Sequence, residues 1–553
     1  MITTTDLANL IFPDIKENLD DLEARFPKRN LLPNALVTRF APSPTGFLHT
    51  GSLFTAMISK KVASMSNGVF YLRLEDTDTK REIKDSGRDL VSELAAFNVT
   101  IDEGYQGDAE TGLYGPYKQS ERKTIYQTVI KTMLIKGLAY PCFASTQELE
   151  AIRRIQEANK ELTGYYGKYA IYRNYRLEDA YRRIKNGDPF VIRFKSHGNH
   201  HQKIMVTDLI RGSFMIQENE IDVVIYKSDE LPTYHFAHVV DDHFMRTTTV
   251  IRGEEWISSL PLHLEMFQAL DFEAPAYAHL PVIMKLDNGA KRKLSKRHDP
   301  EAATSFFTNS GYPSEAIIIY LLSIANSNFE EWLIKEGILN YPAFDFSFDN
   351  MSLDGALFDL GKINYFAKEY LAALDKKTLT DKALKFGEGH ALELVTLINQ
   401  DRNYFESIIN IERDTEKKRK DFTTYFDILN NVKFFYRDYY LKMLDVHTFN
   451  PKFSFQDLRL VIDTLLNENE TFTDEQLWFS KMKELAAILN FATNNKLYKE
   501  QPDHYRGNIS DFIEIYRIAI TTSKNSPNLL QVLNVLGPEE IRFRLQFVNT
   551  LFV

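Results

Sequence analysis

The chain contains very little cysteine. Its 553 residues include a single one, Cys142, which excludes a disulfide framework within the chain. A zinc site built from several cysteines is excluded for the same reason. Chains without disulfides are typical of reducing compartments, and we expect this protein to act in one.

Long apolar runs are also missing. The longest, Ala316 to Ala325, is interrupted by Ser323 and is too short to span a bilayer. The N-terminal residues carry acidic side chains early, rather than a basic segment followed by an apolar one, which is unlike a secretory or transit peptide. The sequence therefore predicts a cytoplasmic protein.

The composition is that of a large globular protein. With 44% hydrophobic and 26% charged residues, the chain has material for several cores. Its length predicts roughly three or four domains. The net charge of −10 argues against a protein coated with nucleic acid. A specific RNA partner would need local positive stripes, which an acidic body still allows.

The pattern of residues 36–78 indicates strand, loop, helix and strand in that order. The apolar run from Leu36 to Phe40 predicts a buried strand that ends before Pro42, because proline cannot donate to a sheet. Apolar residues recur at helical spacing after Gly46, and Val69 to Leu74 has strand character. This order typically opens a parallel nucleotide-binding sheet, whose ligand crevice lies beyond the carboxyl ends of the strands.

The segment RFAPSPTGFLHTGS, Arg39 to Ser52, follows the first of these strands. Gly46 would let the backbone approach a ligand closely. The helix after it offers unpaired N–H groups and a positive dipole end to phosphate, and His49 at its start can donate to phosphate oxygens. A proline-rich connection with a capping histidine would explain PSPTG alone, but the full set with Arg39 and Gly51 favours a phosphate site.

A second signature, KLSKRH, spans Lys293 to His298 after a turn at Asp287 to Gly289. Most basic runs are solvated loops. Here two uncharged residues separate Lys293 from Lys296, leaving two point charges that can close on a triphosphate and stabilise departing pyrophosphate. Together the two signatures predict ATP-dependent activation of an amino acid.

With these signatures the chain resembles the glutamyl-tRNA synthetases of class I, bacterial type. The class's HIGH and KMSKS motifs correspond to HTGS at 49–52 and KLSKR at 293–297. Further stretches that carry the resemblance are LRLEDTD (72–78), GPYKQSER (115–122), PTYHFAHVVDDHFM (232–245) and VIRGEEWISS (250–259). The similarity covers roughly residues 36–370.

The resemblance implies an α/β fold with a Rossmann-type parallel-sheet catalytic domain, an inserted α+β acceptor-binding domain and an all-α C-terminal anticodon-binding region. The expected boundaries are an N-terminal helical extension at 1–34, the first catalytic half at 35–111, the acceptor-stem-binding insertion at 112–231, the second catalytic half with the KLSKR loop at 232–300, a helical stem-contact region at 301–370 and a helical anticodon-binding domain at 371–553.

The resemblance also implies the site residues. His49, Lys293 and Lys296 are expected to be catalytic. ATP is expected to bind at Thr45, Gly46, His49, Gly51, Trp256, Lys293, Ser295 and Lys296. Glutamate is expected to bind at Arg39, Ser43, Glu75, Tyr234, His238 and Arg252, with Arg252 on the side-chain carboxylate. These types suit glutamate, because its two carboxylates and one ammonium need two cationic forks and one anion. A salt bridge between Glu75 and Arg252, or with their neighbours, is the structural alternative.

The chain departs from the family in three places. Thr50 stands where an aliphatic residue is usual, and His238 where asparagine is common. Many members bind zinc through a Cys-x-Cys pair, but this chain has Cys142, Phe143 and Ala144 there. We therefore expect no structural zinc and no metal other than the Mg²⁺ that accompanies ATP.

The predicted function is ATP-dependent attachment of L-glutamate to the 3′ end of tRNA(Glu) through a glutamyl-adenylate, with release of AMP and pyrophosphate, by a monomeric ligase. Arginines and tyrosines of the insertion suit the acceptor arm, with cations for phosphate and rings for unpaired bases. Two alternatives stay open: a nondiscriminating enzyme that also charges tRNA(Gln), and an inactive tRNA-binding relative.

Overall fold

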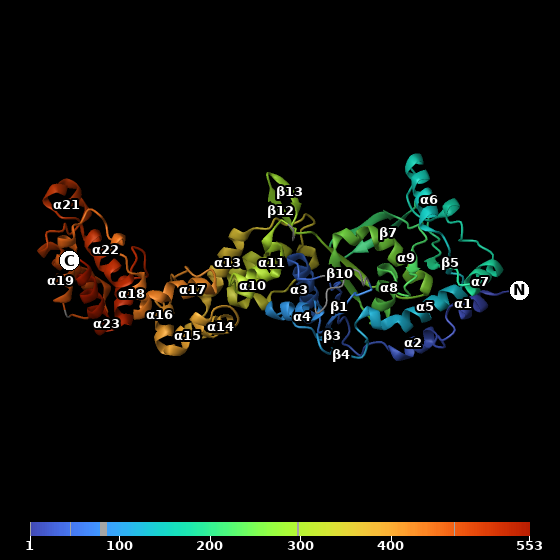
Figure 1. The fold of residues 1–553 in the computed structure, drawn as a ribbon, viewed down its shortest axis with the longest axis horizontal. Helices are drawn as coiled ribbons and strands as arrows, with labels where there is room; N and C mark the ends of the chain where they lie inside the picture. The colour runs from blue at the N-terminus through green and yellow to red at the C-terminus, as the bar shows by residue number, and fades with distance from the viewer. Residues whose placement is uncertain (1, 45, 78–85, 296–297, 469, 553) are drawn as a thin grey trace. The chain divides into compact units, whose positions relative to one another are not determined.

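The computed structural model describes residues 2–44, 46–77, 86–295, 298–468 and 470–552. The chain forms two compact units, one from Met1–Thr308 with Ile317–Leu360 and the other from Asn309–Ala316 with Gly361–Val553. Mixed α/β structure makes up the first unit, and helices make up the second (Figure 1). Every helix within the described ranges is too short or too polar to serve as a membrane span.

A parallel sheet opens the first unit. Strand β1 (Val37–Phe40) pairs in parallel with β2 (Val69–Leu72), which pairs in parallel with β3 (Glu103–Tyr105). Strand β4 (Glu110–Thr111) runs antiparallel at the edge. Helix α3 (Thr50–Met65) crosses from β1 to β2 and buries its apolar positions against them. The expected order of strand, loop, helix and strand is confirmed, and α4 (Ser86–Ala96) follows β2.

A second sheet extends the first. Its strand order is β10 (Thr249–Gly253), β11 (Ala276–Leu280), β7 (Lys203–Asp208) and β8 (Gly212–Gln217), with only the β7–β8 pair antiparallel. The N–H of Thr248 donates to the carbonyl of Val37 at 3.0 Å, so β10 begins beside β1. Residues 203–217 fall inside the segment expected as the insertion, but β7 pairs with β11 of this sheet.

The rest of the insertion is built on a smaller antiparallel sheet. Its strands are β5 (Ala139–Cys142), β6 (Val191–Phe194) and β9 (Val224–Tyr226). The helices around it are α5 (Lys123–Ile135), α6 (Thr146–Asn159) and α7 (Leu177–Lys185). The N-terminal extension forms α1 (Thr4–Ile11) and α2 (Leu19–Arg25), and α1 packs against α5 and α7.

The elements that follow carry part of the candidate site. They are α8 (Tyr234–Phe244), the 3-10 helix η3 (Glu254–Ser259), α9 (Leu260–Leu270) and the hairpin of β12 (Met284–Asp287) with β13 (Ala290–Lys293). Then come η4 (Pro300–Ala302), α10 (Thr304–Asn309), α11 (Ser314–Ala325) and α12 (Phe329–Glu336).

Side-chain caps begin many helices of the second unit, for example those of Asp375, Ser454 and Asn508. The helices are α13 (Leu360–Ala373), α14 (Lys376–His390), α15 (Leu392–Gln400), α16 (Arg402–Ile409), α17 (Tyr425–Val432), α18 (Arg437–Met443), α19 (Phe455–Leu466), α20 (Glu475–Ile488), α21 (Asn495–Glu500), α22 (Ile509–Thr521) and α23 (Leu529–Leu551). The expected α/β fold with a helical C-terminal region is thus confirmed.

Candidate active site

His49 starts helix α3 and caps it. Its Nδ1 accepts a hydrogen bond from the N–H of Gly51 at 2.9 Å. Because Nδ1 is an acceptor, a neutral imidazole carries its proton on Nε2 and can donate it to an anion. A Cβ on Gly51 would come within 3.3 Å of Nδ1, so glycine keeps the cap undistorted. Gly46 has φ +111°, a conformation that side chains rarely adopt.

The HTGS segment lies against the residues that follow KLSKRH. The hydroxyl of Thr50 donates to the carbonyl of Glu301 at 2.9 Å, and the N–H of Thr304 donates to the carbonyl of Leu48 at 3.1 Å. The chain just after the second signature therefore meets the first signature, although about 250 residues separate the bonded groups. A hydroxyl is unusual at this place. Thr50 is 1% exposed, and its hydroxyl is satisfied by the carbonyl of Glu301.

The KLSKRH segment begins at Lys293, the last residue of a tight hairpin. Asn288 and Gly289 both have positive φ, 49° and 84°, which suits the two-residue turn between β12 and β13. Lys293 ends β13 with its side chain 60% exposed and its Nζ 3.4 Å from Oε1 of Glu255. Two of the implied ATP residues, Thr45 and Lys296, lie outside the described residues.

Asp299 holds residues on both sides of Lys293, and sequence reasoning missed it. The guanidinium of Arg292 donates to both carboxylate oxygens of Asp299, at 2.5 and 2.8 Å, and the N–H of Ser295 donates at 2.9 Å. Lys285 adds an ion pair at 3.1 Å. Hydrogen bonds from Arg292 hold the pKa of Asp299 well below its usual range, so an ionised carboxylate holds Arg292 and the backbone of Ser295.

The residues implied for glutamate gather at the carboxyl ends of β1, β2 and β10. Arg39 in β1 and Arg252 in β10 are both buried, and Nη1 of Arg39 donates to the carbonyl of Ile251 at 3.3 Å. Glu75 follows β2, and its N–H donates to the carbonyl of Pro42 at 3.0 Å. Ser43 lies exposed in the loop after β1.

Aromatic rings from two elements line the same region. Tyr234 at the start of α8 packs on Trp256 of η3, with ring centroids 4.3 Å apart. The carbonyl of Trp256 accepts from Nη2 of Arg252 at 3.3 Å, and the guanidinium lies 4.9 Å from the ring centre of Tyr277. Burial raises the pKa of Tyr234 to about 12, so its hydroxyl stays protonated.

Glu75 forms its salt bridge with a neighbour and not with Arg252. Oε1 of Glu75 accepts from Nη2 of Arg73 at 3.0 Å, while Nη1 of Arg73 donates to Asp242 at 2.6 Å. Nε of Arg39 lies 3.5 Å from Oδ2 of the same Asp242. Burial raises the pKa of Glu75. Arg73 and Asp242 therefore support the implied glutamate residues from behind, although neither was predicted.

His238 is completely buried in the same cluster. Its Nδ1 lies 2.8 Å from Oδ2 of Asp242, although the pair lacks hydrogen-bond geometry, and its Nε2 lies 3.1 Å from the hydroxyl oxygen of Tyr277. Burial lowers the pKa of His238 to about 3, so the imidazole is neutral at pH 7. A neutral imidazole resembles the asparagine common at this place in having no charge.

Several arginines of the insertion make pairs within it. Arg173 contacts Asp222, while Nε of Arg183 donates to Asp188 at 2.6 Å and its guanidinium lies 4.2 Å from the ring centre of Phe143. These arginines stabilise the insertion itself, which is the structural reading of such a basic stretch.

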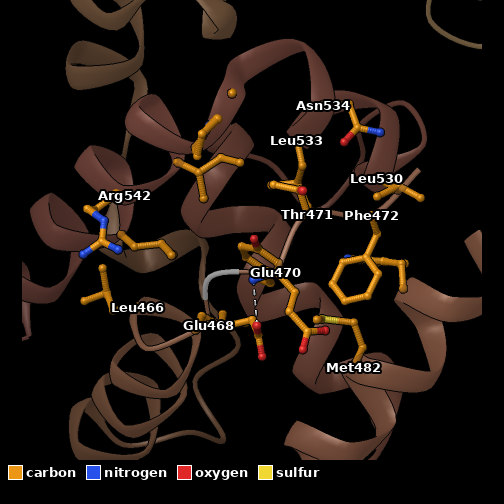
Figure 2. A pocket seen from close by; sticks show the side chains of 17 residues that line it. Leu466, Glu468, Glu470, Thr471, Phe472, Met482, Leu530, Leu533, Asn534 and Arg542 are labelled. Atoms are coloured by element: carbon orange, nitrogen blue, oxygen red, sulfur yellow. Dashed lines mark hydrogen bonds between the residues drawn. The ribbon is translucent and has the colours of Figure 1, made fainter. Parts of the chain in front are cut away.

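A separate cavity of about 220 Å³ lies among the helices of the second unit (Figure 2). Its lining includes Phe472, Met482 and Arg542 (Figure 2). Gly537, whose φ of 76° interrupts α23, and Pro538 line it as well. The cavity shares no residue with those implied for ATP or glutamate.

Comparisons with known proteins give matches along most of the chain. The family model described as tRNA synthetases class I (E and Q), catalytic domain, matches residues 35–359. A glutamate–tRNA ligase of Clostridium perfringens strain 13 is 42% identical over 542 residues, covering 98% of this chain and 99% of the relative. One from Sorangium cellulosum is 36% identical, with 95% and 97% covered. A crystal structure of a glutamate tRNA ligase from Elizabethkingia meningosepticum, in complex with its amino acid, gives a TM-score of 0.74 at 26% identity and covers 94% of this chain and 100% of that one.

Proposed function

The chain belongs to the glutamate–tRNA ligases of class I, and from this premise we propose that it attaches L-glutamate to the 3′ end of tRNA(Glu) at the expense of ATP. The observation that carries the proposal is the state of Arg252. This buried cation has no carboxylate within 4.0 Å among the described residues, which suits a site that receives the carboxylate of its substrate.

Glutamate would bind by its three charged groups. Arg252 would take the side-chain carboxylate and Arg39 would face the α-carboxylate, with Glu75 as the anion for the ammonium group. Tyr234 and His238 would close the pocket sides, and Ser43 would contact the substrate from the loop after β1. A neutral amide in place of the side-chain carboxylate would leave Arg252 buried without its charged partner, which is a physical basis for rejecting glutamine.

Activation would need no protein nucleophile. An α-carboxylate oxygen of glutamate attacks the α-phosphorus of ATP, the bond to the β-phosphate oxygen breaks, and pyrophosphate leaves. ATP enters as its Mg²⁺ complex. His49, Lys293 and Lys296 would stabilise the phosphate charge that develops in this step. The remaining ATP contacts would come from Thr45, Gly46, Gly51, Trp256 and Ser295.

In the second step the terminal ribose hydroxyl of the tRNA attacks the carbonyl carbon of the adenylate, and AMP leaves. We propose that the enzyme works as a monomer in the cytoplasm, without structural zinc, which the single cysteine supports. Charging of tRNA(Gln) as well remains the alternative, and the residues that read the anticodon would decide it.

Exchange of labelled pyrophosphate into ATP tests the activation step. We expect exchange with glutamate when tRNA(Glu) is present, and negligible exchange without the tRNA. Lys296→Ala should nearly abolish exchange and leave tRNA affinity largely intact, whereas the control Lys291→Ala, at an exposed lysine of β13, should keep most of the exchange. Absence of exchange with tRNA present would contradict the function. Robust exchange with glutamate and ATP alone would contradict the requirement for tRNA.

A further inference from the structure

The guanidinium of Arg252 is held by three acceptors of the protein. Nε donates to Nε2 of His279 at 3.0 Å, Nη1 contacts Nδ1 of His263 at 3.3 Å, and Nη2 donates to the carbonyl of Trp256 at 3.3 Å. An arginine has five N–H donors and no acceptor. Two donors are therefore left, one on each terminal nitrogen, and this is the pair that a carboxylate can accept from both oxygens.

The tautomer of His279 follows from its two partners. Because Arg252 can only donate, Nε2 of His279 must accept, and the proton of a neutral imidazole then lies on Nδ1. Nδ1 lies 2.7 Å from Oδ2 of Asp208, which also accepts from the N–H of His279 at 3.0 Å. His279 and Asp208 are both completely or almost completely buried. The carboxylate thus fixes the imidazole, and the imidazole fixes the guanidinium.

The backbone places this chain of contacts. Arg252 and His279 are paired residues of β10 and β11, and Asp208 ends β7, the next strand in the sheet. The N–H groups of Ile210 and Arg211 both donate to Oδ1 of Asp208 at 3.0 Å, so its side chain has a single orientation. The sheet register therefore sets the direction of the arginine.

A second pair of histidines supports the other edge of the guanidinium. Nδ1 of His263 accepts from Arg252, so Nε2 of His263 carries the proton and donates to Nδ1 of His235, 3.0 Å away. His263 comes from α9 and His235 from α8. The positions of the protons on these neutral imidazoles therefore follow from one fact, that an arginine side chain cannot accept a hydrogen bond.

Neutral acceptors, unlike carboxylates, leave the positive charge of Arg252 uncompensated and available to the substrate. If a carboxylate of the protein were paired with Arg252, it would compensate the charge of the guanidinium and occupy the N–H donors that the substrate needs. Arg39, by contrast, has Asp242 at 3.5 Å. Burial lowers the pKa of both His279 and His263, which keeps the two imidazoles uncharged beside the cation.

We propose that His279, held by Asp208, and His263, held by His235, are positioning residues that orient Arg252 without neutralising it, and so determine selection for a carboxylate side chain. This inference rests on the proposed function, because it assumes that glutamate is the substrate bound at Arg252. None of the four supporting side chains needs to touch the substrate.

The test compares two substitutions of His279 in tRNA aminoacylation. His279→Leu removes the acceptor, whereas His279→Gln can return an oxygen acceptor near the position of Nε2. For His279→Leu we expect the KM for glutamate to rise about 10- to 100-fold, the range for losing a hydrogen bond to a charged group. The preference for glutamate over glutamine should fall with it, and the KM for ATP should change less than about 2-fold. His279→Gln should recover most of the loss, as expected of a positioning hydrogen bond.

His243→Leu is the matched control. His243 lies on α8, stacks on Phe272 and pairs with Glu23, outside the implied glutamate residues. The substitution His243→Leu should leave the KM for glutamate unchanged. If His279→Leu does not fold, His263→Leu gives the same readout from the other edge of the guanidinium.

Three results would overturn the inference: a folded His279→Leu with an unchanged KM for glutamate, equal rises in the KM values for glutamate and ATP, or no recovery with a folded His279→Gln. A wild-type protein that does not charge tRNA with glutamate would overturn the proposed function instead. The two failures are therefore distinguishable.

Discussion

Replacing His238 by asparagine should flatten the dependence of the first unit's stability on pH. Burial lowers the pKa of His238 to about 3, against 6.5 for the unperturbed side chain. The folded state therefore prefers the neutral imidazole, while the unfolded state takes up a proton below pH 6.5. The contribution of neutral His238 to the free energy of unfolding is fully present above pH 6.5 and is lost as the pH falls towards about 3.

The size of the effect follows from the two pKa values. Between the two pKa values one proton is taken up on unfolding. Each fall of one pH unit in this range therefore lowers the free energy of unfolding by about 1.4 kcal/mol. Between about pH 7 and pH 5 the histidine therefore lowers stability by about 2 kcal/mol, which asparagine, having no titrating group, would not do. Asp242 and the other buried histidines stay in both proteins, so the difference between the two profiles isolates His238.

Urea unfolding followed by tryptophan fluorescence, repeated across this pH range, measures the difference. Trp478→Phe should be the common background, because the remaining Trp256 and Trp332 lie in the first unit with His238. His197→Asn is the control, since its imidazole is exposed in the same unit. Parallel pH profiles for the parent and His238→Asn would mean that His238 does not titrate on unfolding.

Three further substitutions test other parts of the site. Arg252→Gln removes the charged fork and should lower kcat/KM for glutamate by about 100- to 1000-fold, since charge-assisted recognition of a buried group is lost; a change below tenfold would contradict its role. Thr50→Val leaves the carbonyl of Glu301 without its donor and should lower the free energy of unfolding of the first unit by about 1–3 kcal/mol, measured in urea; unchanged stability would mean that the contact contributes nothing. Asp299→Asn should raise the KM for ATP in aminoacylation more than the KM for glutamate, because it weakens the hold on Arg292, the residue before Lys293 in β13; an equal rise in both would contradict this role of Asp299.

Local features of the site could be predicted from the sequence. The cap by His49 and the turn at Asn288 and Gly289 depend on residues adjacent in the chain, so their chemistry is readable from a few letters. The order of strand, loop, helix and strand over residues 36–78 likewise followed from hydrophobic spacing. The resemblance then supplied the residues implied for glutamate, which the structure brings to neighbouring strand ends.

The supporting residues could not be predicted because their contacts span long sequence distances. Asp208 and His279 meet across 71 residues, and Arg73 and Asp242 across 169. Each reads in the sequence as an ordinary polar residue at the end or the edge of an apolar segment. Only the sheet register that pairs Arg252 with His279 reveals the connection.

The departure at Thr50 shows the same limit. From the sequence it is a polar residue in place of an aliphatic one, with no visible partner. In the structure its hydroxyl reaches the carbonyl of Glu301, 251 residues later in the chain. Thr50 therefore adds a hydrogen bond from the first signature to the segment that follows the second one.

The choice of amino acid and of tRNA can be measured together by charging purified tRNA(Glu) and tRNA(Gln) with labelled glutamate and glutamine, one amino acid at a time. We expect that tRNA(Glu) accepts glutamate and that neither tRNA accepts glutamine, because Arg252 keeps its charge and two donors for a carboxylate. Glutamate on tRNA(Gln) as well would favour the nondiscriminating alternative without changing the site. Charging with glutamine at a rate comparable to glutamate would contradict the account.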